Sequence, residues 1–74
     1  MNNSGDRPDW QQRVIDEHAE IEGRCDRLAA FLGTSTFEAL PSAEQERLVR
    51  QSGIMVQYSD VLAERIKAFL GATA

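Results

Sequence analysis

Few side chains in this sequence could take part in covalent or metal chemistry. His18 is the single histidine and Cys25 the single cysteine. One cysteine cannot form an internal disulfide, and at an apolar position it packs as a small hydrophobic side chain. Glu17, His18 and Glu22 lack the spacing of metal ligands, and no nucleophile is placed beside the imidazole. We therefore expect no enzyme activity, no metal site and no cofactor.

Side chains suited to binding an anion are more numerous. Arginine guanidinium groups form forked hydrogen bonds with phosphate oxygens, and an aromatic ring can stack on a nucleobase. Tyr58 has two interpretations, as a packed phenol or as a ring presented for stacking. His18 either hydrogen-bonds within the fold, to Glu22 or to Tyr58 at the same height, or contacts a ligand. The arginines can equally be solvated and paired along a helix, as Arg13 can be with Asp9.

The composition excludes several classes of protein. With 74 residues, of which 42% are hydrophobic and 27% charged, the chain has the size of one small globular domain. Eight Lys and Arg against twelve Asp and Glu give a net charge of −4, which argues against duplex DNA or long RNA as a partner. No apolar run reaches the ~18–20 residues of a membrane span, and the polar start, residues 1–6, is unlike a signal peptide. We expect a cytoplasmic protein with no membrane partner.

Apolar residues at helical spacing predict a first helix over residues 9–32. Asp6 is expected to cap this helix after a flexible N-terminal tail, residues 1–8. Gly33 is expected to end it in the left-handed conformation, which glycine adopts without strain. The residues expected to face the second helix are Trp10 or Gln11, Val14, His18, Ile21, Cys25, Leu28 and Leu32.

A connector over residues 33–41 is expected to hold one helical turn, residues 36–40, capped by Ser35. The second helix is predicted over residues 42–70. Ser42 followed by Gln45 is typical of a capping box, in which the glutamine side chain reaches back to the helix start. The residues expected to face the first helix are Leu48, Gln51, Met55, Tyr58, Leu62, Arg65 or Ile66, and Phe69.

The two helices therefore predict a single all-α domain, residues 9–71, folded as an antiparallel hairpin. If Leu28 lies opposite Leu48, then Gly23 and Gly53 fall at the same height. Glycine inside a helix costs about 1 kcal/mol relative to alanine. Two glycines at one height suggest a close backbone crossing or room for another group, unless they are merely tolerated.

The second helix carries more apolar surface than one partner helix can cover. Ile54, Val61 and Ala68 recur every seven residues on a second face. A chain this short is marginally stable alone, and an exposed apolar stripe marks an interface. We therefore predict a homo-oligomeric helical bundle with Trp10, Ile54, Val61 and Ala68 in the interface. The alternative is that these residues pack under the connector and the N-terminal tail.

Over about residues 10–69 the sequence resembles a family of very small bacteriophage proteins, relatives of a crAss-like phage protein. No single stretch is diagnostic, and the set as a whole carries the resemblance. The stretches are Gln12–Glu17, Leu28–Thr34, Phe37–Pro41, Glu44–Leu48 and Met55–Ile66.

Compact phage proteins of this kind resemble the anti-CBASS and anti-Thoeris sponges, which oligomerise and hold cyclic nucleotide signals without cleaving them. The resemblance implies a homo-oligomeric sponge for a cyclic di- or trinucleotide in the cytoplasm of an infected bacterial host. It carries over Arg13, Tyr58 and Arg65, with Arg47 behind them, as ligand-binding residues. His18 stands where the family pattern has a lysine, so a positive charge there would depend on pH.

Two other functions remain open from the sequence alone. The Ile54, Val61 and Ala68 stripe, if it stays exposed after assembly, favours an interaction module that binds a host or phage protein. A structural or assembly factor without a ligand would need the same helices and no pocket.

Overall fold

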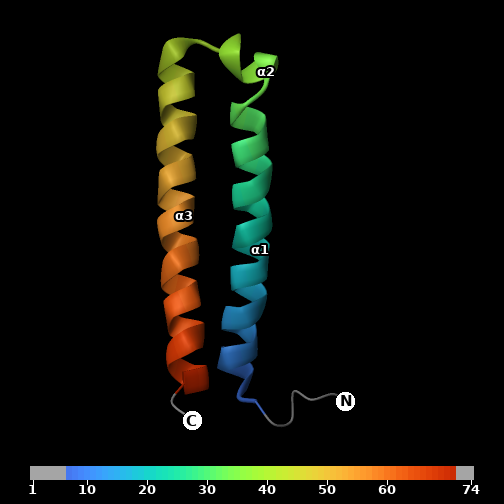
Figure 1. Ribbon diagram of the computed structural model, residues 1–74, viewed down its shortest axis with the longest axis vertical. Coiled ribbons are helices and arrows are strands. Elements are labelled where there is room, and N and C mark those ends of the chain that lie inside the picture. Colours follow the sequence, from blue (N-terminus) through green and yellow to red (C-terminus); the bar gives the residue numbers. More distant parts are fainter. Residues whose placement is uncertain (1–6, 72–74) are drawn as a thin grey trace.

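The computed structural model describes residues 7–71 and consists of two long antiparallel helices joined by a short one (Figure 1). Helix α1 spans Asp9–Leu32, α2 spans Ser35–Glu38 and α3 spans Ser42–Gly71. The molecule measures 49 × 24 × 15 Å. No strand occurs among residues 7–71, and no helix there is long and apolar enough to cross a membrane. The predicted all-α class and the packing of two long helices are confirmed.

The ends of α1 differ from the sequence prediction. The residue before the helix is Pro8, which makes no side-chain capping bond, whereas the predicted cap, Asp6, lies outside the described residues. The Pro8 carbonyl accepts from the backbone N–H of Gln11 at 3.0 Å. At the other end Gly33 has φ −92°, so the expected left-handed conformation is wrong. Its N–H donates to the Ala30 carbonyl at 3.2 Å, a tightened last turn that needs no special backbone region.

The connector is capped one residue earlier than predicted. Thr34, not Ser35, lies before α2, and its Oγ1 accepts from the Phe37 N–H at 3.2 Å. The ring of Phe37 then meets that of Phe31 edge to face, with centroids 6.1 Å apart. This contact closes the connector end of the helix pair, as expected for Phe37.

The predicted capping box at the start of α3 is wrong. Ser42 lies inside the first turn, where the Pro41 carbonyl accepts from the Gln45 N–H at 3.0 Å. The Gln45 side chain instead donates through Nε2 to the carbonyls of Leu40 at 2.9 Å and Glu38 at 3.1 Å. It therefore ties the helix to the connector rather than to its own first residue.

The core is small and contains a polar residue. Val14 and Ile21 of α1 and Leu62 of α3 are buried, and Ser59 is buried beside them. The residues of α3 that face α1 are Leu48, Ser52, Met55, Ser59, Leu62, Ile66 and Phe69, all at least half-buried. Their steps alternate four and three along the whole helix, as lengthwise packing requires.

Two residues predicted on this seam, Gln51 and Tyr58, are exposed instead. The pattern was hidden because serines occupy two of the positions that face α1. A small hydroxyl side chain lets the helices approach without leaving a gap. The neighbouring, more apolar Tyr58 was chosen in place of Ser59.

The pairing of the helices is shifted by about one turn relative to the prediction. The rings of Trp10 and Phe69 meet edge to face, with centroids 5.3 Å apart. Tyr58 lines the same hollow as Ile21, one turn along α1 from the predicted partner, His18.

The predicted close crossing of the glycines is also wrong for the hairpin. A Cβ at Gly53 would meet no atom within 4 Å, and one at Gly23 would meet only the Arg27 side chain of its own helix, at 3.3 Å. Neither glycine is needed for the packing of α1 on α3.

Candidate functional site

Helix α3 presents three apolar stripes rather than two. Ile54-Met55-Val56 is followed seven residues later by Val61-Leu62-Ala63. The middle residue of each triplet faces α1, and its neighbours lie about 100° to either side. Ile54 is 58% exposed and Val56 47% exposed. The hairpin therefore covers one stripe of α3 and leaves two uncovered.

We call the predicted stripe, Ile54, Val61 and Ala68, the first flank. The second flank is Val49, Val56 and Ala63, and all six residues are exposed. Sequence reasoning noted Val49 and Val56 only as neighbours of the first flank. The seven-residue spacing that revealed the first flank also runs through Val49, Val56 and Ala63, and could have revealed the second.

On one broad side of the hairpin, the Tyr58 side, a hollow of about 180 Å³ lies between the helices. Its lining residues are Glu17, Glu20, Ile21, Arg24 and Tyr58. Arg24 donates through Nη2 to Glu20 Oε2 at 3.1 Å, and the Tyr58 side chain is exposed. An aromatic ring and a guanidinium group thus lie on one apolar floor. Sequence reasoning had grouped Arg24 with the connector-end arginines instead.

Three of the predicted ligand-binding residues share this side. Arg13 precedes Glu17 of the hollow by one helical turn, and Arg65 follows Tyr58 by two turns. Among residues 7–71, neither Arg13 nor Arg65 forms an ion pair. Their guanidinium groups are therefore free to bind an anion.

The other two predicted ligand-binding residues lie apart from this hollow. Arg47 is about three turns from Tyr58 toward the connector, and its Nη2 pairs with Glu44 Oε1 at 2.7 Å. His18 is half-buried, with Nε2 3.6 Å from Glu22 Oε2, so the predicted alternative partner, Glu22, is the one observed. Glu22 belongs to the opposite broad side of the hairpin. The structure thus separates His18 from Tyr58.

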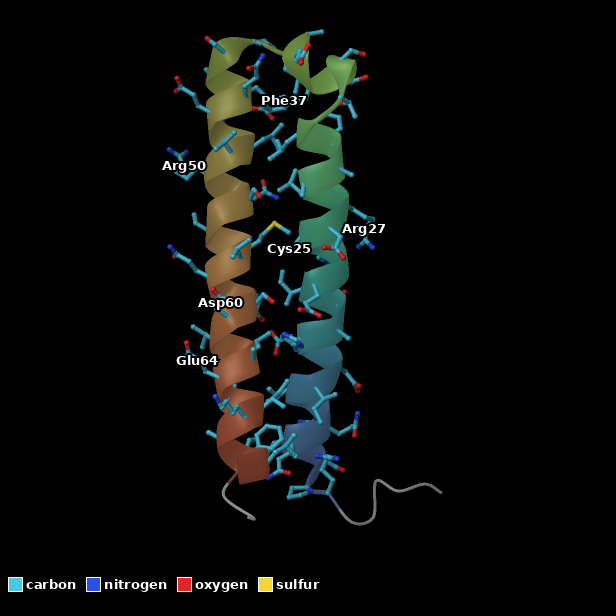
Figure 2. The ribbon with its side chains drawn as sticks, in the orientation of Figure 1. Cys25, Arg27, Phe37, Arg50, Asp60 and Glu64 are labelled. Atoms are coloured by element: carbon cyan, nitrogen blue, oxygen red, sulfur yellow. The ribbon has the colours of Figure 1, made fainter. Side chains whose placement is uncertain are left out.

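The opposite side, the Asp60 side, is acidic. A hollow of about 290 Å³ there is lined by Glu22, Cys25, Asp26, Val56, Ser59 and Asp60. Figure 2 shows Cys25 pointing between the helices, where it packs against the core. No group of three or more potential metal ligands is assembled within residues 7–71.

A third hollow, of about 480 Å³, lies beside the connector and continues the second flank. Its lining residues are Phe37, Ser42, Gln45, Glu46, Val49 and Arg50. In Figure 2 Phe37 lies at the connector end and Arg50 points outward from α3. The second flank is therefore hollowed at both ends, beside Val49 and beside Val56.

Binding, rather than bond making, is the chemistry that these surfaces suit. Sites for small molecules usually enclose about 300–1,000 Å³, and the Tyr58 hollow, at about 180 Å³, is smaller. One hairpin therefore offers one wall of a nucleotide-sized pocket.

Comparison with known families gives one match. The model of the Sequestin family matches residues 8–68, a range that covers α1, the connector and most of α3. Neither the curated proteins nor the solved structures give a match.

Proposed function

The chain belongs to the Sequestin family, and on that premise we propose that it binds and sequesters a cyclic di- or trinucleotide without cleaving it. The family name denotes sequestration. Such a protein would act as an anti-CBASS sponge in an infected bacterial cell, lowering the free concentration of the immune signal. The observation that carries the proposal is the exposed Tyr58 ring beside unpaired arginines on an otherwise acidic chain.

Each group on the Tyr58 side has a role in this proposal. Tyr58 stacks on a base, an interaction worth about 1–3 kcal/mol. Arg13 and Arg65 bind phosphate oxygens in forked hydrogen bonds. Arg24 joins them when a phosphate replaces Glu20 as its partner, since an exposed ion pair costs little to open.

The proposed ligand site is completed by a second copy of the chain. The hollow beside Tyr58 is too small for a dinucleotide, and Ile54 and Val61 beside it are more than half exposed. Association would bury these side chains and place a second wall over the ring. The proposal is therefore a homo-oligomer whose pocket lies between hairpins.

A thermal-shift panel of cyclic dinucleotides, cyclic trinucleotides and cyclic ADP-ribose isomers tests this function. A ligand at 100 times its Kd stabilises the folded state by about 2.7 kcal/mol, which raises the Tm of a domain this small by several degrees. No shift with any nucleotide, in a preparation shown to be oligomeric, would exclude the proposal.

Variants then locate the site. Tyr58→Ala and Arg65→Ala are expected to abolish the shift while the oligomer persists. Glu64→Ala, on the same helix and away from the hollow, is the matched control and keeps the shift. If both site variants retain wild-type binding, the ligand lies elsewhere on the assembly.

A second candidate function rests on the second flank. Val49 and Val56 are exposed beside two hollows that a nucleotide on the Tyr58 side does not fill. A protein–protein interaction module for a host or phage protein would use this surface. Wild-type nucleotide binding by a Val56→Glu variant would separate the two functions, because only the second depends on Val56.

A further inference from the structure

The two flanks of α3 differ in charge as well as in position. Arg50 precedes Ile54 of the first flank by one turn, and Arg65 follows Val61 by one turn. On the Asp60 side, three carboxylates surround Val56 of the second flank: Glu22, Asp26 and Asp60. The apolar surface of α3 is thus cationic along one edge and anionic along the other.

These charges lack partners within the hairpin. Among residues 7–71, Arg50, Asp26 and Asp60 form no ion pair. Each flank therefore exposes apolar side chains together with unneutralised charge of one sign. Opposite signs across an interface favour the correct pairing, whereas like signs placed face to face disfavour it.

From this charge pattern we infer that the first flank of one copy packs against the second flank of another. A contact of first flank on first flank would bring Arg50 of both copies together, and a contact of second flank on second flank would gather the carboxylates. The unlike pairing buries Ile54 and Val61 against Val49 and Val56 and sets arginine against Asp60. The chain's own cationic apolar surface is the partner that its acidic apolar surface fits.

The dimensions allow such a contact. A stable interface buries about 800 Å² per partner, and a broad side of the hairpin measures 49 × 24 Å. Because the two surfaces in contact are different, every copy keeps one free flank after pairing. Association then continues until a ring closes or a filament forms.

This inference extends the assembly on which the proposed function rests, and it does not depend on the ligand. Its test therefore uses the full chain without nucleotide, and the readout is mass in solution. If the flanks pair as inferred while the nucleotide panel stays negative, only the sponge function fails. If nucleotides bind while the flanks do not pair, only the inference fails.

The test uses one blocked flank per variant. Ile54→Glu removes the first flank and Val56→Glu the second, and each variant alone is expected to be monomeric, near 8.3 kDa. Mixed in equal amounts, they are expected to form a dimer of twice that mass, because each supplies the flank that the other lacks. Ala19→Glu adds the same charge on α1 away from both flanks and is expected to leave wild-type mass.

Two results would overturn the inference. A contact between like flanks would leave one of the single variants dimeric by itself, and no contact between flanks would leave the mixture monomeric. Circular dichroism of the mixture shows whether helicity returns on pairing. Should the glutamate variants stay unfolded even when mixed, Arg50→Glu and Asp60→Arg provide the same test, with weakened assembly of each alone and recovery in the mixture.

Discussion

Ile54 provides a sharp test of whether α3 is covered by another copy. In the hairpin its side chain is 58% exposed, and substitutions at such surface positions usually change the free energy of unfolding by less than about 0.5 kcal/mol. Alanine is also a better helix former than isoleucine. For a lone hairpin, Ile54→Ala is therefore expected to be neutral or slightly stabilising.

An assembled α3 gives a different magnitude. Truncating a fully buried isoleucine to alanine costs about 2–5 kcal/mol. More than half of the Ile54 side chain remains to be buried by a partner, so about half of that cost or more, at least about 1 kcal/mol per copy, is assigned to association. A loss of that size lowers the Tm of a domain of 60–100 residues by at least about 4 °C.

The assay is thermal unfolding followed by circular dichroism at several protein concentrations. Ile54→Ala is expected to melt at least about 4 °C below wild type, with a Tm that rises with concentration because association stabilises the fold. Glu64→Ala on the same helix is the control and is expected to match wild type within about 2 °C. A Tm for Ile54→Ala equal to wild type at every concentration would refute the argument that α3 is covered.

Three further substitutions test the fold. Ser59→Leu is expected to destabilise by about 1–3 kcal/mol in urea unfolding, because the buried seam position has no room for a larger side chain; an unchanged midpoint would contradict tight packing there. Thr34→Ala is expected to cost about 1 kcal/mol through loss of the cap on the Phe37 N–H, whereas Thr36→Ala, which removes no cap, should leave the melting curve in place. Gly53→Ala is expected to raise the Tm, since a Cβ there meets nothing within 4 Å and alanine gains about 1 kcal/mol in helix propensity; a lower Tm would show that another backbone approaches Gly53.

The sequence was a good guide to the helices because their apolar residues recur with the helical period. It was a poorer guide to the seam of α3. Ser52 and Ser59 face α1, yet nothing in their polarity indicates burial, and the pairing was consequently placed about one turn away. The second flank was missed for a related reason, because Val49 and Val56 were read as neighbours of Ile54 rather than as a stripe of their own.

Helix ends were predicted least well. Sequence patterns for caps assume that each end is satisfied locally. Gln45 instead uses its amide to donate to two connector carbonyls, a contact that exists only after the chain has turned. Gly33 ends α1 with φ −92°, which the residue type alone does not distinguish from the left-handed alternative.

The candidate site was predicted in part. Arg13, Tyr58 and Arg65 share one side of the hairpin because helical spacing alone fixes which residues share a face. His18 lies on the other side with Glu22, because the one-turn shift between the helices moves it away from Tyr58. Relations between helices depend on packing details, whereas relations along one helix do not.

The mass of the full chain in solution tests the central claim most directly. The claim is that the exposed flanks of α3 are covered by other copies and that the ligand pocket lies between hairpins. Sedimentation equilibrium at micromolar concentration is predicted to give a multiple of the 8.3 kDa chain mass. A single species of 8.3 kDa with intact helicity would contradict the account.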